Sequence, residues 1–468
     1  MGEAVDEITS MSATALAKAI RDRQVSSEEA VNAYMKRIKT VNPKLNAVVQ
    51  LAEAARKEAR EADDAVARGD LKGPFHGVPI TIKDTLDTAG VISTGGTKGR
   101  ATYVPETDAS AVARMRSAGA ILIGKTNVPE LALAPETDSL VYGCTNNPYD
   151  LSRSPGGSSG GEASIIAAGG SPIGLGSDCG GSIRAPAHFC GLAGIKPTTG
   201  RVSRTGHFPP VDGLMNRLWQ VGPIARFVED LILALPVISG VDWRDPILVP
   251  ITLGDPDMVT LKNLRVACYT DNGILSPTKE TIEVVKKVVE AVSDKVMSVE
   301  EDCPENIEQT YDLWWGLSSG DKGSGVAAIL KMAGTTEPHR YLKRFQEAQD
   351  ANLDMTPAAI GSLISKWDIF CSKMIRFMEN YDVIICPAVA FPAQNHGFIL
   401  EKDKDLGFSY CFTYNLTGWP AAVVRGGTSP DRLPIGVQLV ARPWREDVAL
   451  AVARCIEAAL GGWQPPPI

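Results

Sequence analysis

Apolar and polar positions follow helical spacing in the first seventy residues. Ser26, with Glu29 three positions later, forms a capping-box pattern that marks the start of a helix. Apolar residues then recur on one helical face: Val31, Tyr34 and Ile38. Residues 53–68 are rich in alanine and charge, which predicts a second, solvated helix.

Short buried strands follow this helical part. Residues 78–82 and 120–123 are apolar runs of strand length, and residues 110–117 between them have helical spacing. The alternation of strand and helix predicts an α/β fold.

The rest of the chain continues this alternation, apart from two stretches. Residues 146–210 shift toward Gly, Ser and Pro but keep apolar segments at 165–168 and 173–175, which a flexible linker would lack. Residues 243–262 are polar and contain proline, which favours a surface crossing between two lobes. The later predicted elements are a helix at 227–238, a strand at 264–269, a helix capped by Ser276 and Pro277 and ending near Val292, strands at 383–385, 421–424 and 435–440, and a helix at 447–460.

Composition excludes several classes of function. The chain has 468 residues, of which 44% are hydrophobic, so it can bury a large core. Its net charge of −8 comes from acidic and basic residues mixed along the chain, so no basic stripe marks a nucleic-acid partner. The acidic first ten residues do not resemble a signal peptide, and the longest apolar runs contain Pro or Gly and are shorter than the ~20 residues of a membrane helix. We therefore expect a cytoplasmic protein without a membrane span.

The nine cysteines are scattered along the chain. They form no C-x-x-C pair, and no histidine cluster at metal-ligand spacing accompanies them. We therefore expect reduced thiols and no metal site.

Residues 154–161, S-P-G-G-S-S-G-G, admit three interpretations: a linker, a phosphate-binding loop or a nucleophile elbow. A phosphate loop would end in G-K-[ST], which is absent. The elbow pattern at residues 156–160 requires a buried strand just before it, but residues 147–153 are polar and contain proline. The phosphate loop and the elbow are therefore both disfavoured.

Residues 176–187, G-S-D-C-G-G-S-I-R-A-P-A, follow the strand-like residues 172–175. The two glycines before Ser182 let the backbone approach a substrate carbonyl and direct successive N–H groups at one point. The expected donors to a developing oxyanion are the backbone N–H groups of Cys179, Gly180, Gly181 and Ser182. Asp178 and Arg184 flank this turn and are expected to hold it by a charge-assisted hydrogen bond.

Lys83 ends the apolar strand within residues 77–84, G-V-P-I-T-I-K-D. Taken alone, such a lysine is an ordinary surface charge at the end of a strand. Together, in this order and spacing, the three segments resemble the amidase signature family. Further similar segments lie at residues 189–192, 194–198, 415–420 and 433–439, so the resemblance covers nearly the whole chain.

The resemblance implies a fold and a catalytic triad. The fold is a single domain of residues 1–468, with a large mixed central β-sheet covered by helices on both faces. Its parts are a helical start (1–70), a catalytic core (71–240), a variable substrate-shaping part (241–380) and closing strands with a helix (381–468). The triad is Ser182 as nucleophile, Ser158 after a cis peptide bond as proton shuttle, and Lys83 as base, with Ser159 in support. A lysine base near neutral pH needs a pKa lowered from ~10.4 to roughly 7–8, and burial of Lys83 after its core strand would supply this.

The resemblance also implies hydrolysis of carbon–nitrogen bonds through an acyl-enzyme, with a small amide, aryl amide or carbamate as substrate and no cofactor. Aromatic candidates for an apolar pocket are Trp219, Trp314, Trp315 and Phe345, although such residues are more often plain core. By analogy, the backbone near Ala132 and Leu133 borders the acyl cavity. The Cys179 side chain is expected to pack, because no positioned histidine accompanies it.

Two alternatives stay open. One is the A-type component of a tRNA-dependent amidotransferase, which would hydrolyse glutamine inside a complex. The other is a catalytically silent scaffold, against which the competent residues at all three triad positions argue. A stand-alone enzyme would act as a monomer or homodimer on a small-molecule amide or carbamate.

Overall fold

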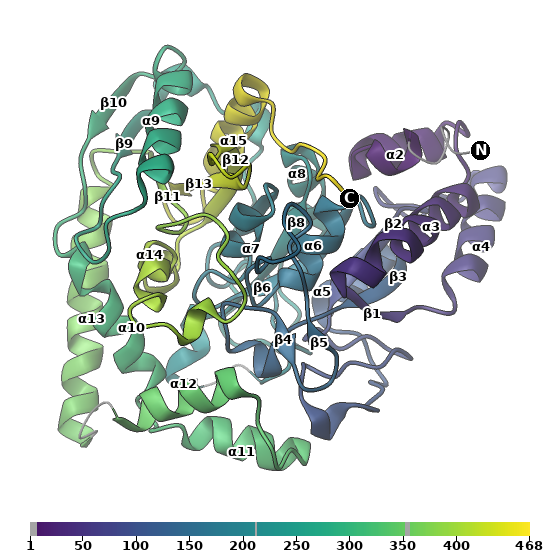
Figure 1. Cartoon of the computed structure of the whole chain (residues 1–468). Coiled ribbons are helices and arrows are strands. Elements are labelled where there is room, and N and C mark those ends of the chain that lie inside the picture. The colour runs from purple at the N-terminus through teal and green to yellow at the C-terminus, as the bar shows by residue number, and fades with distance from the viewer. Residues whose placement is uncertain (1–6, 211–212, 352–355) are drawn as a thin grey trace.

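A mixed β-sheet of eleven strands runs through the computed structural model, which describes residues 7–210, 213–351 and 356–468 (Figure 1). In sheet order the strands are β1 (Val48–Leu51), β3 (Ile121–Thr126), β2 (Pro79–Lys83), β6 (Ile173–Asp178), β8 (Gln220–Ala225), β7 (Ala193–Lys196), β12 (Ala421–Thr428), β13 (Pro434–Ala441), β11 (Val383–Pro387), β9 (Arg265–Cys268) and β10 (Ser298–Glu301). The predicted α/β fold with a large mixed sheet is confirmed. Residues 243–262 connect β8 and α8 to β9 within this one sheet, so they do not join two separate sheets.

Helices cover both faces of the sheet. The described helices are α2 (Ala13–Arg21), α3 (Ser27–Leu45), α4 (Ala55–Arg68), α5 (Ser110–Ser117), α6 (Gly160–Ala167), α7 (Arg184–Phe189), α8 (Val228–Ile238), α9 (Lys279–Ser293), α10 (Thr310–Ser318), α11 (Ser324–Ala333), α12 (Arg340–Ala351), α13 (Pro357–Phe377), α14 (Ser409–Leu416) and α15 (Glu446–Leu460). On β13, Gly436 lies against His188 of α7, whereas the next residue, Val437, lies beside Val288 of α9. Because neighbouring residues of a strand point to opposite faces, α7 and α9 cover opposite faces of the sheet.

The capping box predicted for α3 is confirmed. Ser26 Oγ accepts a hydrogen bond from the Glu29 N–H at 3.0 Å, and the Glu29 carboxylate accepts one from the Ser26 N–H at 2.8 Å. Val31, Tyr34 and Ile38 are buried on one face, as their spacing predicts. The next helix, α4, is less solvated than expected, because four of its alanines and Val66 are buried.

The predicted cap of α9 is wrong. The N-cap is Thr278 rather than Ser276, and the helix begins at Lys279. The Ser276 hydroxyl instead donates to the Asp271 carboxylate in the preceding loop. A Ser-Pro pair marks a helix start only when no nearby carboxylate competes for the serine hydroxyl.

The central strands bring the sequence motifs to one edge of the sheet. β2 runs parallel to β6, with Thr81 opposite Gly174 and Ile82 opposite Leu175. Their carboxyl ends therefore lie together, and the chain leaves β2 at Lys83 and β6 at Asp178. The strand predicted at residues 172–175 continues three residues further than its apolar part, because it pairs with β8 as far as Gln220.

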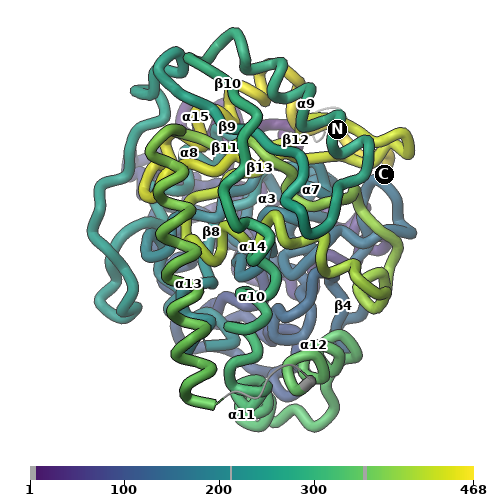
Figure 2. Tube along the Cα trace, turned by 90° about the vertical axis from the view of Figure 1, so that its left-hand side faces the viewer, coloured from purple at the N-terminus to yellow at the C-terminus, as the bar shows by residue number. Residues whose placement is uncertain are grey.

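Residues of α10, α12 and the loop before α14 lie beside this edge, where they line a cavity together with Ser182. Figure 2 shows α13 along one side of the molecule, with α11 and α12 near one of its ends. Among the described residues, no helix combines the length and apolar character needed to cross a bilayer.

Candidate active site

Lys83 is fully buried at the end of β2, whose five residues are all buried. Its Nζ lies 2.7 Å from Ser158 Oγ, 3.0 Å from Ser177 Oγ and 3.3 Å from the Ser177 carbonyl oxygen. Burial lowers the pKa of Lys83 to about 7, against the opposing effect of the Asp178 and Glu162 carboxylates. A buried lysine of this kind exchanges its proton near neutral pH.

Ser158 is held in a tight loop between Gly156 and α6. The Gly157–Ser158 peptide bond is cis, as the family resemblance implies, and Gly156 has a φ of +84°. A side chain at Gly157 would come within 2.7 Å of the Glu136 nitrogen, so only glycine fits. Ser158 itself is 1% exposed, and the loop thus presents its hydroxyl to Lys83 in a site closed to solvent.

Ser159 ties this loop to β6. Its Oγ donates to the Ser177 carbonyl oxygen at 3.3 Å and accepts from the Ser177 N–H at 3.4 Å. Its own N–H donates to the Ser182 carbonyl oxygen at 3.3 Å. The two serine-bearing turns are therefore side by side, although among the described residues no hydrogen bond joins the Ser158 and Ser182 side chains.

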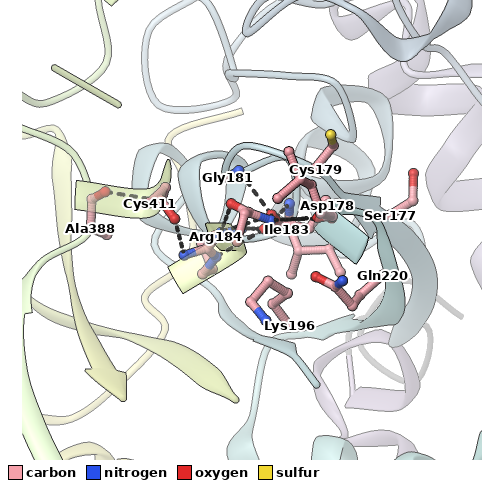
Figure 3. Close-up of polar contacts among 12 residues, drawn as sticks. Ser177, Asp178, Cys179, Gly181, Ile183, Arg184, Lys196, Gln220, Ala388 and Cys411 are labelled. Carbon is pink, nitrogen blue, oxygen red and sulfur yellow. Dashed lines mark hydrogen bonds and ion pairs between the residues drawn. The ribbon is translucent and has the colours of Figure 1, made fainter. Parts of the chain in front are cut away.

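The turn after β6 is built around a buried ion pair, as predicted. Arg184 Nη2 donates to Asp178 Oδ1 at 2.8 Å, and both side chains are fully buried. Asp178 also accepts from the N–H groups of Gly181 at 2.8 Å and Ile183 at 3.1 Å (Figure 3). Burial would raise the pKa of Asp178, but the Arg184 guanidinium holds it well below its usual range. The carboxylate thus fixes the backbone on both sides of Ser182.

The pair is in turn held by the carboxyl-terminal part of the chain. Asn415 Nδ2 donates to Asp178 Oδ1 at 2.9 Å, and its Oδ1 accepts from Arg184 at 2.6 Å. Arg184 also donates to Gln438 Oε1 of β13 at 2.7 Å and to the Cys411 carbonyl oxygen at 2.9 Å. The Asp178 carboxylate and the Arg184 guanidinium are therefore both satisfied by hydrogen bonds within the protein.

The predicted set of oxyanion donors needs one correction. The Gly181 N–H is already donated to Asp178, so it serves the turn rather than a substrate. In the part of the chain that the structure describes, no group accepts from the backbone N–H of Cys179, Gly180 or Ser182. These three N–H groups remain as candidates.

A cavity of about 180 Å³ opens next to Ser182. Among the predicted residues, Ala132, Leu133, Trp314, Trp315 and Phe345 line it. Its remaining lining residues are Ala134, Pro135, Gly157, Cys179, Gly180, Ser182, Tyr311, Tyr341, Arg344, Ala348, Ile399, Asp405, Phe408 and Phe412. Leu131 and Ala132 both have positive φ, near +55°, where the backbone bends around the cavity.

Trp219 does not line this cavity, although the other three aromatic residues predicted with it do. It lines a neighbouring cavity, and among the described residues the two cavities have Leu133 and Phe345 in common. Its indole N–H donates to His207 Nε2 at 3.2 Å, and this hydrogen bond holds the ring beside His207 rather than in the first cavity. Through this hydrogen bond to His207, Trp219 belongs to the group of buried polar residues around Lys83.

The chain is similar to known amide hydrolases along most of its length. The family model described as Amidase matches residues 29–450. Fatty-acid amide hydrolase 2-B of Danio rerio is 35% identical over 492 aligned positions, which cover 98% of this chain and 91% of that protein. The chain belongs to the amidase signature family. It is accordingly a hydrolase of carbon–nitrogen bonds other than peptide bonds.

Two other members of the family show the breadth of its similarity. The A-type component of glutamyl-tRNA(Gln) amidotransferase from Carboxydothermus hydrogenoformans is 33% identical, covering 96% of this chain and 97% of that protein. The solved structure of 6-aminohexanoate cyclic dimer hydrolase complexed with substrate is 30% identical, with a TM-score of 0.85, and covers 96% of this chain and 97% of that one. The similarity thus runs along the full sheet and is not limited to the site.

The Cys179 side chain packs in the protein interior, as expected from the sequence. The side chain is buried, and burial raises the pKa of the thiol well above its usual value. The Cys179 carbonyl oxygen accepts from the Trp314 indole N–H at 3.1 Å. Cys179 therefore joins the turn to the cavity wall through its backbone.

Three residues of the site, Ser177, His207 and Glu162, were not predicted from the sequence. Ser177 contacts Lys83 directly, and His207 Nε2 lies 2.9 Å from Ser177 Oγ. Glu162 is fully buried against the hydroxyls of Thr81 and Thr126, and burial raises its pKa to about 7. Ser177 and Glu162 lie inside or next to the quoted motifs, so a search for buried polar residues there would have found them, whereas nothing in the sequence places His207 beside Lys83.

Removing the charge of Arg184 should destabilise the protein strongly. Arg184→Met leaves the Asp178 carboxylate buried without its counter-charge, and we expect the free energy of unfolding to fall by about 3–5 kcal/mol in chemical denaturation. Arg265→Met is the matched control, because it removes a partly exposed pair with Asp382 and should cost under about 1 kcal/mol. Similar small losses in both variants would contradict the structural role of the buried pair.

Proposed function

We propose that this enzyme cleaves amides and carbamates that carry an apolar or aryl group, with Ser182 as nucleophile, Ser158 as proton shuttle and Lys83 as base. The observation that carries the proposal is the buried Lys83 Nζ at 2.7 Å from Ser158 Oγ, in surroundings that lower the lysine pKa to about 7. A lysine with this pKa is a competent general base near neutral pH.

In the proposed acylation, neutral Lys83 takes the proton of Ser158, which takes the proton of Ser182 as Ser182 Oγ forms a bond to the carbonyl carbon. The electron pair of the carbonyl moves to its oxygen, which accepts hydrogen bonds from the N–H groups of Cys179, Gly180 and Ser182. The proton then passes back through Ser158 to the leaving nitrogen as the carbon–nitrogen bond breaks. This step requires the Ser158 and Ser182 hydroxyls to come within hydrogen-bond reach once substrate is bound.

Water completes the reaction. It loses a proton along the same relay while its oxygen attacks the acyl-enzyme, and Ser182 regains its proton as the acid leaves. A carbamate acylates Ser182 in the same way, giving a carbonate ester when the bond to nitrogen breaks.

The cavity supports an apolar or aryl substrate group. The Trp314 and Phe412 rings stack with centroids 4.2 Å apart, and Tyr311, Trp315 and Phe345 extend this aromatic wall. Aromatic walls favour flat or apolar groups, because most of the free energy comes from removing their surface from water. Asp405, one of the two charged residues of the lining, already accepts a hydrogen bond from Tyr311.

Glutamine hydrolysis in an amidotransferase complex is the alternative, and the 33% identity to the A-type component of such an enzyme supports it. Glutamine carries a charged amine and carboxylate, for which the cavity offers Asp405 and Arg344. We favour the stand-alone enzyme, because the rest of the lining is largely aromatic and aliphatic.

A substrate panel separates these alternatives. The purified chain, without partners, is assayed on an aryl amide, an aliphatic amide, an aryl carbamate and glutamine. We expect kcat/KM for the two aryl substrates to exceed that for glutamine by at least about tenfold, as burial of an aromatic ring in the cavity predicts. Turnover of glutamine alone would support the amidotransferase assignment instead.

Labelling by a fluorophosphonate probe tests the nucleophile. The wild-type chain should react covalently, and Ser182→Ala should not, because the probe modifies an activated serine hydroxyl. Ser152→Ala, on the exposed surface, serves as the control and should label like wild type. Persistent labelling of Ser182→Ala would disprove the nucleophile assignment.

The proton relay predicts a pH profile. Lys83 must be neutral to act as a base, so kcat/KM should rise with pH through about 7 and level off above it, with the titration of the neighbouring Glu162 broadening the rise. Lys83→Met, which keeps an apolar chain of similar length, should lower kcat by about 10²–10⁴-fold. Near wild-type turnover in this variant would rule out Lys83 as the base.

A further inference from the structure

Ser177 lies between Lys83 and a buried histidine. Its Oγ is 3.0 Å from Lys83 Nζ on one side and 2.9 Å from His207 Nε2 on the other. Ser177 is fully buried and His207 is 6% exposed, so these contacts form away from bulk solvent. The orientation of the Ser177 hydroxyl therefore decides whether it donates a hydrogen bond to Lys83 or accepts one from it.

The neighbours of His207 determine its tautomer. The Trp219 indole nitrogen can only donate, and it lies 3.2 Å from His207 Nε2, so Nε2 must accept. The Pro209 carbonyl oxygen can only accept, and it lies 3.0 Å from Nδ1, so Nδ1 carries the proton. The ring is neutral, because burial, helped by the nearby cations Lys83 and Arg204, lowers the pKa of His207 to about 3.

This tautomer orients the Ser177 hydroxyl. The single lone pair of Nε2 is shared by the Trp219 N–H at 3.2 Å and the Ser177 hydroxyl at 2.9 Å, so the hydroxyl donates to His207 and turns its own lone pairs toward Lys83. Lys83 then has two acceptors on Ser177, the hydroxyl oxygen and the carbonyl oxygen. A neutral lysine amine has two N–H groups and one lone pair, so once both N–H groups are donated to Ser177 the lone pair faces Ser158.

We propose that His207 is a positioning residue that acts through Ser177 to aim the lone pair of neutral Lys83 at the Ser158 hydroxyl. The proposal deepens the triad described above and rests on Lys83 being the base. Without His207, the Ser177 hydroxyl rotates and donates to the Lys83 lone pair. Ser177 then competes with Ser158 for the base.

His207→Phe removes the acceptor and keeps a ring, which makes it the primary test. We expect kcat per folded molecule to fall about tenfold or more with KM within about twofold of wild type, the effect of misdirecting one hydrogen bond at the base. The midpoint of the kcat/KM profile should move to lower pH by about half a pH unit, because a hydroxyl that donates to the lysine favours its neutral form. The other groups facing Lys83, which are Asp178, Glu162 and Cys179, remain in place in this variant.

Three further variants show whether His207 acts through Ser177. His207→Gln supplies an amide oxygen near the position of Nε2 and should keep kcat within about threefold of wild type with an unmoved midpoint. His76→Phe removes another buried histidine, whose ring is hydrogen-bonded to the backbone of Lys72 and Ala62, and should change neither quantity. In a Ser177→Ala background, His207→Phe should cause no additional change in kcat or in the midpoint, because the hydroxyl through which His207 acts is already absent.

The outcomes separate this proposal from the function on which it rests. The positioning role is overturned if His207→Phe leaves kcat and the midpoint unchanged. It is also overturned if His207→Phe and His207→Gln lose activity equally and neither moves the midpoint. In both cases the triad stands as long as Lys83→Met is inactive. Active Lys83→Met overturns the triad itself. If His207→Phe does not fold, His207→Met applies the same test, since it also removes the acceptor and should move the midpoint in the same direction.

Discussion

The site depends on one buried amine. Lys83 ends a strand with no exposed residue, and its neighbours are mainly hydroxyls and a carbonyl oxygen rather than a directly paired carboxylate. A paired carboxylate at hydrogen-bond distance would keep the amine charged, whereas hydroxyls satisfy it in either protonation state. The surroundings therefore supply hydrogen bonds to Lys83 without fixing its charge, which is the condition that a base must meet.

A second buried ionisable group of the site, Asp178, is kept permanently charged, whereas Lys83 can lose its charge. Asp178 is held ionised by Arg184, and it orders the turn that carries Ser182 by accepting backbone N–H groups. Because Arg184 also binds residues of α14 and β13, the turn has its full set of hydrogen bonds only when β12 is paired with β7 and β13 with β12. This explains in physical terms why segments more than 200 residues apart belong to one functional unit.

The sequence predicted the elements that periodicity determines and missed those that tertiary contacts determine. The helix at residues 110–117 and the strands containing Lys83 and Ile385 follow from spacing alone, whereas β8 contains Pro223 and a glycine and becomes a strand only because β6 and β7 flank it. At the site, the triad positions followed from motifs in order. The place of Trp219 could not, because an aromatic residue in a loop gives no signal of whether it lines a cavity or donates to a buried histidine.

The cavity and the backbone donors are joined by one peptide unit. Trp314 donates to the carbonyl oxygen of Cys179, which belongs to the same peptide plane as the N–H of Gly180. In a trans peptide the two groups point in opposite directions, so the hydrogen bond from the cavity wall directs the Gly180 N–H away from Trp314. A substrate group that packs against Trp314 and its stacked partner Phe412 therefore acts on the same peptide that is proposed to stabilise the oxyanion. Binding of the apolar group and stabilisation of charge at the carbonyl are thus physically linked through the backbone of Cys179 and Gly180.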